Sequence, residues 1–282
     1  MTDYFQQLIL EPDIRDLKEF ARRQDLIAKF QKEKRDAFNR LGPFSLPALV
    51  YEGRLYDLYT AEGEYDTALQ SAKTIYQGLS HSKEQSNDSV VEAFLNLGES
   101  YLNMHDVMRA GAIAAKANLY TTGKTEPQYH ELMARLAKAN GSKDKELSHY
   151  IEAYKTTVAN HGGNNTRLSN LQAALALCYE KQGYFQNATY NYTILLRDAD
   201  KLELSAEERI SLEARRAYCL SKNGQPQLAK QLMELALAKA KEQLRPKHPT
   251  TIRIEKLMEQ FPIPDDADSF PPASVTEPPL KT

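Results

Sequence analysis

Histidine, cysteine and carboxylate side chains are the residues in this sequence that could do chemistry, but their spacing favours no active site. The six histidines are His81, His105, His130, His149, His161 and His248. His130-Glu131 is not followed by a second histidine four residues later, and no Cys-x2-Cys pair occurs. No phosphate-binding glycine loop or Gly-x-Ser-x-Gly elbow is present. The sequence therefore predicts a protein that is not an enzyme and that uses no metal or cofactor.

The two cysteines, Cys178 and Cys219, lie five residues before Gly183 and Gly224, respectively. This shared position predicts small buried core residues in a reducing compartment rather than a disulfide. The opening stretch MTDYFQQLILEPD contains neither a basic leader region nor a membrane span. We therefore expect a cytoplasmic or nucleoplasmic protein that does not enter a membrane.

The charges are almost balanced, with 36 basic and 38 acidic residues and a formal net charge of −2. Such a chain has no global field that would hold nucleic acid or an anionic membrane surface. Tryptophan is absent, and sixteen tyrosines supply much of the aromatic character instead. The composition therefore disfavours nucleic acid and membranes as partners.

A stepped repeat organises most of the chain. A turn residue at position 63, 105, 141, 183 or 224 is followed five residues later by a position that is usually alanine. The residue four before each turn is expected to close a first helix, and the small residue lets a second helix pack closely against it. The small-residue positions are Ala68, Ala110, Glu146, Ala188 and Ala229. We predict about five stacked helical hairpins, which offer an extended binding surface rather than an active-site cleft.

Segments of different character flank the repeats. Residues 13 to 41 contain no Gly or Pro and predict one long helix, which either covers the first repeat as a lid or forms a short coiled coil. Pro249 opens a predicted capping helix that ends near Phe261, and the proline-rich acidic stretch beyond it is expected to be disordered. The predicted organisation is an N-terminal helical segment (1–47), a repeat domain (48–261) and a tail (262–282).

Three local motifs in the repeats resemble those of the tetratricopeptide repeat superfamily. The motifs are Leu95-Asn96-Leu97-Gly98 with Tyr101, Tyr179-Glu180-Lys181-Gln182-Gly183-Tyr184, and Lys247-His248-Pro249-Thr250-Thr251. The turn positions step by 42, 36, 42 and 41 residues, which is similar to the longer repeat of the kinesin-light-chain type. The resemblance implies an all-α, right-handed superhelical solenoid in which the first helix of each hairpin lines a concave groove.

Carried over position by position, the resemblance also implies a set of groove residues. These are Asn96, Glu99 and Asn103 in the second repeat, Arg135 and Lys138 in the third, Glu180 and Lys181 in the fourth, and Arg215, Tyr218 and Lys222 in the fifth. The later repeats are the more basic ones, so the groove is expected to select an acidic or carboxylate-bearing segment. The alternative interpretation is a solvated helix face without a special partner.

The leading hypothesis is a non-enzymatic scaffold or adaptor that binds a peptide segment of a partner protein. A regulatory sensor is a second hypothesis, with the stretch from Gly42 to Pro47 as the hinge between the N-terminal helix and the repeats. A third is a constitutive subunit of a larger complex. The sequence predicts neither the identity of the partner nor the oligomeric state.

Overall fold

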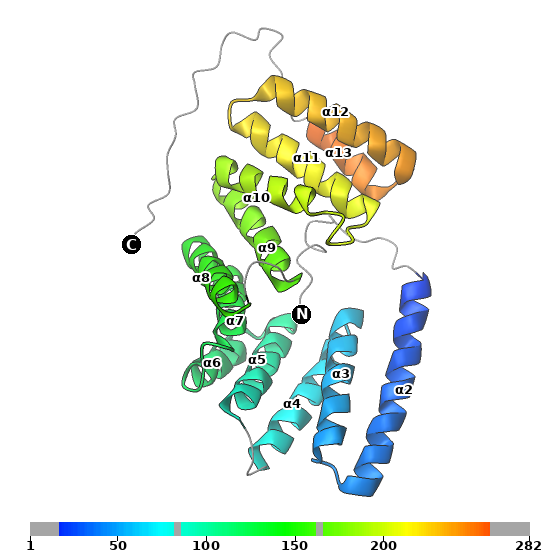
Figure 1. The fold of residues 1–282 in the computed structure, drawn as a ribbon, viewed down its shortest axis with the longest axis vertical. Coiled ribbons are helices and arrows are strands. Elements are labelled where there is room, and N and C mark those ends of the chain that lie inside the picture. Colours follow the sequence, from blue (N-terminus) through cyan, green and yellow to red (C-terminus); the bar gives the residue numbers. More distant parts are fainter. Residues whose placement is uncertain (1–16, 82–85, 162–165, 260–282) are drawn as a thin grey trace. The chain divides into compact units, whose positions relative to one another are not determined.

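The computed structural model describes residues 17–81, 86–161 and 166–259, and every regular element in these ranges is an α-helix (Figure 1). The helices are α2 (Leu17–Leu41), α3 (Leu46–Glu62), α4 (Tyr65–His81), α5 (Asn87–Asn103), α6 (Val107–Asn118), α7 (Glu126–Ala139), α8 (Lys143–His161), α9 (Thr166–Gln182), α10 (Phe185–Arg197), α11 (Ala206–Lys222), α12 (Pro226–Gln243) and α13 (Pro249–Glu259). Helices α3 to α12 form the five predicted hairpins, each a consecutive pair joined at a predicted turn residue.

The five turn residues all adopt the left-handed backbone conformation. The angle φ is 76° at Gly63, 60° at His105, 71° at Gly141, 82° at Gly183 and 76° at Gly224. The amide of the residue after each turn position donates to the carbonyl of the residue that lies four positions before the turn, at 2.8 to 3.0 Å. This hydrogen bond ends the first helix in a Schellman motif. The predicted role of the residue four before the turn is therefore confirmed.

The small residue five positions after each turn lies in the interior of its hairpin. Ala68, Ala110, Ala188 and Ala229 are at most 1% exposed, and Glu146, which replaces alanine in the third hairpin, is 8% exposed. A methyl group at these positions lets the two helices of a hairpin approach closely. The third hairpin accommodates a longer side chain at the same position.

His105 is the non-glycine member of the five turns, and we expect glycine there to stabilise the protein. A left-handed φ costs a residue with a Cβ roughly 1 to 2 kcal/mol, and glycine avoids this cost. The greater freedom of glycine in the unfolded chain takes back about 0.5 to 1 kcal/mol of the stability gained in this way. His105→Gly should therefore raise the free energy of unfolding by about 0.5 to 1 kcal/mol, measured by urea denaturation. Gly141→Ala is the matched control and should be destabilising because φ is 71° there. Open space surrounds the new methyl group, so backbone strain and not a steric clash would cause the loss. Equal or lower stability of the His105 variant would contradict the assignment.

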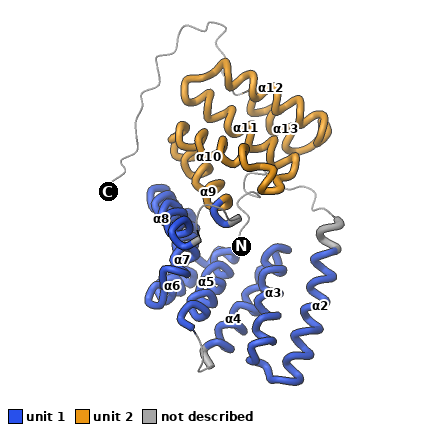
Figure 2. Tube along the Cα trace, in the orientation of Figure 1, with its two compact units in different colours: residues 1, 14–168 blue, residues 2–13, 169–282 orange. Residues whose placement is uncertain are grey.

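The described residues divide into two compact units, 17–168 and 169–259 (Figure 2). The first unit contains α2 to α8 and the first residues of α9, and the second contains the remainder of α9 and α10 to α13. The core of the first unit joins Ile27 of α2 to Leu55 of α3, Ala72 of α4 and Leu97 of α5. The predicted domain boundaries at residues 47 and 261 stay predictions. Helix α2, which was predicted to lie outside the repeat domain, shares a core with the first hairpins.

Helix α2 packs on the first hairpin rather than standing apart. Ile27 is 6% exposed, and Phe30 packs against the same core. Polar contacts frame this apolar seam: the amide of Gln31 donates to the hydroxyl of Tyr59 at 2.8 Å, and Lys34 Nζ lies 2.9 Å from Glu52 Oε2. The lid interpretation of this helix is therefore confirmed for residues 22 to 41, and the part predicted before residue 17 lies outside the described residues.

The last helix closes the core of the second unit. Ile254 of α13 packs with Ile210 and Ala217 of α11 and with Met233 of α12. The Thr250 hydroxyl donates to Glu207 Oε1 at 2.6 Å, which ties the start of α13 to α11. The predicted capping helix is thus confirmed, and the predicted disordered tail lies outside the described residues.

Candidate partner-binding face

In the first unit, three predicted groove residues bind one another across two first helices. Arg135 Nη1 of α7 lies 3.1 Å from Glu99 Oε1 of α5, and Arg135 Nη2 donates to Asn103 Oδ1 at 2.7 Å. The side chains of Arg135 and Glu99 are only 15% and 21% exposed. The guanidinium therefore fastens the third hairpin to the second.

A second ion pair in the first unit joins α7 to the start of α9. Arg167 donates through Nε to Glu131 Oε1 at 2.7 Å and through Nη2 to the same oxygen. Burial raises the pKa of Glu131 above its usual range, although the adjacent guanidinium of Arg167 opposes that shift. Neither residue was among the predicted site residues.

In the second unit, Glu180 of α9 is held between Arg215 of α11 and Tyr192 of α10. Arg215 Nη1 donates to Glu180 Oε1 at 2.9 Å, and the Tyr192 hydroxyl donates to Glu180 Oε2 at 2.6 Å. Tyr192 is fully buried, and the side chains of Arg215 and Glu180 are 13% and 15% exposed. Burial, and secondly the Glu180 carboxylate, raise the pKa of Tyr192, so the phenol keeps the proton that it donates.

These three ion pairs follow one pattern, because an acid in one hairpin binds an arginine 35 or 36 residues later in the chain. The pattern means that two of the predicted basic groove residues are engaged within the fold. Arg135 and Arg215 are mostly buried, and Glu99 and Glu180 neutralise them. Replacing either arginine would therefore lower the stability of the fold, so a loss of partner binding in such a variant could not be assigned to a lost contact with the partner. Their participation in a binding site stays a prediction.

The remaining members of the predicted set are three exposed lysines and one half-buried tyrosine. Lys138, Lys181 and Lys222 are exposed. Lys222 Nζ lies 5.6 Å from the centroid of the half-buried Tyr218 ring, and Tyr218 meets Phe185 edge to face at 6.2 Å. Phe185 was not among the predicted site residues, although its position two residues after the turn could have pointed to it.

Asn96 connects neighbouring hairpins through its backbone rather than its side chain. Its carbonyl accepts hydrogen bonds from the Tyr56 hydroxyl at 3.1 Å and from Ser100 Oγ at 2.8 Å. Tyr56 belongs to α3, so this contact joins the first hairpin to the second. The predicted set thus contains residues that make interhelical contacts (Asn96, Glu99, Asn103, Arg135 and Arg215), three exposed lysines (Lys138, Lys181 and Lys222) and the half-buried Tyr218.

His130 of α7 and His149 of α8 form a contact that sequence reasoning missed. Their Nδ1 atoms lie 3.2 Å apart. Burial lowers the pKa of His149 below its ordinary value of 6.5, and His130 and Lys145 lower it further. At His149 the unfolded state therefore binds more protons than the folded state, so the contribution of this residue to stability falls as the pH drops below 6.5. No group of three or more potential ligands in the described residues could hold a metal ion here or elsewhere.

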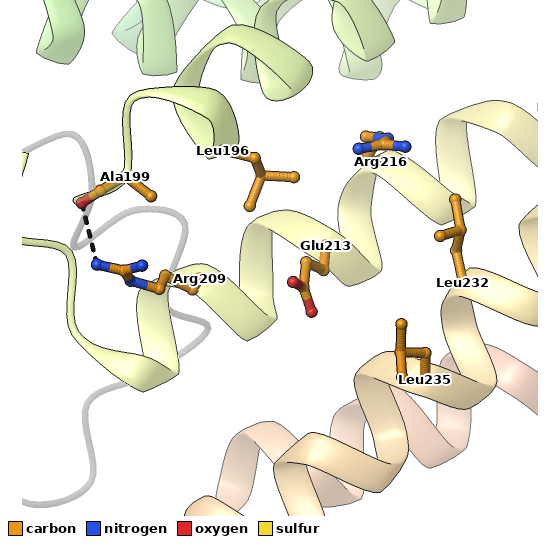
Figure 3. A pocket seen from close by; sticks show the side chains of 7 residues that line it. All are labelled: Leu196, Ala199, Arg209, Glu213, Arg216, Leu232 and Leu235. Atoms are coloured by element: carbon orange, nitrogen blue, oxygen red, sulfur yellow. Dashed lines mark hydrogen bonds between the residues drawn. The ribbon is translucent and has the colours of Figure 1, made fainter. Parts of the chain in front are cut away.

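A small cavity opens beside α11 and α12 in the second unit (Figure 3). It is lined by Leu196, Ala199, Arg209, Glu213, Arg216, Leu232 and Leu235. Two lining charges are already engaged: Arg209 Nη2 donates to the Ala199 carbonyl at 3.2 Å, and Glu213 Oε1 accepts from Lys239 at 2.6 Å. The volume of about 180 Å³ is below the roughly 300 to 1,000 Å³ of small-molecule sites. This cavity has room for a side chain rather than a substrate.

Comparisons with known proteins support the repeat architecture. No protein-family profile matches the chain, and no curated protein matches it in sequence. The solved structure of BtubC (BKLC) from P. vanneervenii is similar over 92% of this chain and 99% of its own length, at 15% identity and a TM-score of 0.62. A putative kinesin light chain from Podosopora anserina with nearly identical TPR-like repeats matches 69% of this chain and 96% of its own, at 20% identity and a TM-score of 0.54. A second crystal structure of that protein, in a substituted form, matches 70% and 96%, at 18% identity and the same TM-score.

The fold is that of the tetratricopeptide-type repeat proteins. At these identities the likeness concerns the fold alone, and at that level the predicted resemblance and the all-α repeat solenoid are confirmed. A tetratricopeptide-type repeat fold is in general a scaffold for protein interactions. Among the described helices of this chain, none is both long and apolar enough to cross a membrane.

Proposed function

We propose that the chain is a non-enzymatic interaction scaffold and that its first helices bind a segment of a partner protein. The observation that carries this proposal is the separation of roles among the predicted groove residues. Arg135 and Arg215 hold adjacent hairpins together, whereas Lys181, Tyr218 and Lys222 remain accessible on α9 and α11. A repeat protein needs both: ion pairs that fix the helices, and accessible groups that meet a ligand.

The chemistry of the accessible groups favours a segment that carries carboxylates. Lys181 and Lys222 offer ammonium groups for charge-assisted hydrogen bonds, and the Tyr218 ring offers an apolar surface beside one of them. We therefore narrow the binding site in the second unit to Lys181, Tyr218 and Lys222. An acidic partner and a cytoplasmic location stay predictions.

Packing at the N-terminal end favours a scaffold over a hinged sensor. Ile27 and Phe30 join α2 to the core of the first hairpin, and Lys34 pairs with the buried Glu52 of α3. Bending at Gly42 would have to break these contacts. A ligand could drive this motion only if it bound the bent state much more tightly than the packed state.

A photocrosslinking experiment tests the proposed face. Benzoylphenylalanine is placed at Lys222 and, as a control, at Tyr190, which is 67% exposed on the second helix α10. We expect one set of partner proteins to crosslink from position 222 and not from position 190. The same partners should be lost from the purified complex when Lys181 and Lys222 are both changed to Glu. The matched control changes the exposed second-helix residues Lys116 and Lys230 to Glu.

The charge-reversed protein should remain folded, because exposed substitutions change stability by less than about 0.5 kcal/mol. Circular dichroism melting checks this. If the partners persist with the double Lys181 and Lys222 variant, or crosslink equally from both faces, then the first-helix face is not the binding site.

A further inference from the structure

A groove separate from the proposed binding face lies over α3 in the first unit, between α2 and α4. It encloses about 410 Å³, and its lining includes Lys34 and Phe38 of α2, Leu49 and Glu52 of α3, and Gln70 of α4. A second hollow of about 390 Å³ shares Lys34, Phe38 and Tyr59 with it and adds Gln31 and Arg35. We call the two together the α2–α4 groove. Its size is in the range of binding sites rather than packing defects.

One end of the α2–α4 groove is apolar and accessible. Phe38 is 51% exposed and Phe44 is 41% exposed, although both line the groove. Leu41, Leu46 and Val50 lie around the same turn between α2 and α3 and are 63%, 73% and 47% exposed. Large apolar side chains gathered in this way mark interaction sites when polar groups border them.

The other end is polar and basic. Lys34 and the buried Glu52 neutralise each other at 2.9 Å. Arg35 is exposed at the groove and has no ion pair or hydrogen bond with the described residues. The α2 residues that line the groove include two basic residues, Lys34 and Arg35, and no acidic residue, so this side of α2 is positively charged. An anionic group beside an apolar anchor would complement the groove.

We propose that the α2–α4 groove docks an acidic segment of a partner protein that carries one large apolar side chain. The apolar side chain lies against Phe38, Phe44 and Leu49, and a carboxylate next to it binds the Arg35 guanidinium. Within α3 the groove is lined by Ala48, Leu49, Glu52 and Tyr59, none of which is among the residues predicted for the first-helix face. The proposal adds a second binding surface and is independent of Lys181 and Lys222.

The test compares two fluorescein-labelled peptides on the full chain by anisotropy. The acidic probe is fluorescein-Asp-Asp-Glu-Phe-Ser-Asp-amide, and its charge-reversed counterpart has lysine at each acidic position. Four variants are used: Phe38→Ala and Arg35→Glu inside the groove, with Arg40→Glu on the same helix and the 85% exposed Met108→Ala on α6 as matched controls. All four sites are exposed, and thermal melting confirms that each variant is folded.

We expect saturable binding of the acidic peptide, at least tenfold weaker with either groove variant and changed by less than twofold with either control. The basic peptide should bind at least tenfold more weakly than the acidic one. Equal binding of both peptides, no binding of the acidic peptide, or equal losses with Arg35→Glu and Arg40→Glu would each overturn the proposal. A dimer in sedimentation that Phe38→Ala dissociates would also overturn it, because the groove would then bind a second copy of the chain.

Discussion

Replacing Arg215 with alanine should lower the free energy of unfolding by about 3 to 5 kcal/mol, the usual cost of removing one member of a buried ion pair. The loss is large because the Glu180 carboxylate would lose its cationic partner in a site where its side chain is only 15% exposed. In the part of the chain that the structure describes, the Tyr192 hydroxyl would remain as the hydrogen-bond donor to that carboxylate. Urea denaturation followed by circular dichroism measures the change.

Two further variants separate the ion pair from simple loss of side-chain volume. Arg216→Ala removes a neighbouring half-buried arginine and should cost about 1 kcal/mol or less. Glu180→Gln combined with Arg215→Met removes both charges and keeps an acceptor for the Tyr192 hydroxyl, so most of the lost stability should return. If Arg215→Ala were no more destabilising than Arg216→Ala, the buried pair would not hold the fourth and fifth hairpins together.

Removing residues 1–41 should destabilise the first unit by roughly 3 to 6 kcal/mol, since Ile27 and Phe30 each contribute about 1.5 to 3 kcal/mol when they cover the core. The deletion uncovers Leu55, Tyr56 and Tyr59 of α3, which pack in the same cluster. We expect a lower melting temperature and aggregation on gel filtration.

A point-mutation arm distinguishes lost packing from a general effect of truncation. Ile27→Ala combined with Phe30→Ala should reproduce most of the loss in the full-length chain. Ala28→Ser, at the exposed position between them, should leave the melting temperature within about 2 °C of the wild type. Unchanged stability of the deletion would mean that α2 contributes little to this core, contrary to its packing in the structure.

The hairpins could be predicted from the sequence because the signals that define them are local. A left-handed residue and a small residue five positions later are contained within ten residues of chain, and both were found even where His105 replaces glycine. Glu146 shows that the spacing outweighs any single residue, because the third hairpin forms without alanine in the small-residue position.

The site was harder to predict because it depends on contacts between residues far apart in sequence. The position of Arg215 on the predicted groove side of α11 says nothing about its partner, and only the packing of α9 brings Glu180 within 2.9 Å of it. The acid-to-arginine interval of 35 or 36 residues was present in the sequence as a signal for this pairing. The α2–α4 groove offered no such signal, because three helices build it.

The ion pairs between hairpins also limit how this protein can gain or lose repeats. Glu99 and Arg135 lie equally far from their turns, six residues in each case (99 to 105 and 135 to 141), and so face each other directly. Deleting the third hairpin would place Glu99 beside Leu177 of α9, six residues before Gly183, whereas Arg167 lies sixteen residues before that turn. The ten-residue difference displaces the two charges by about 15 Å along the helix axis. Each interface thus recognises its own neighbour, and the order of the hairpins is constrained by charge, so their shuffling during evolution would leave buried charges without partners.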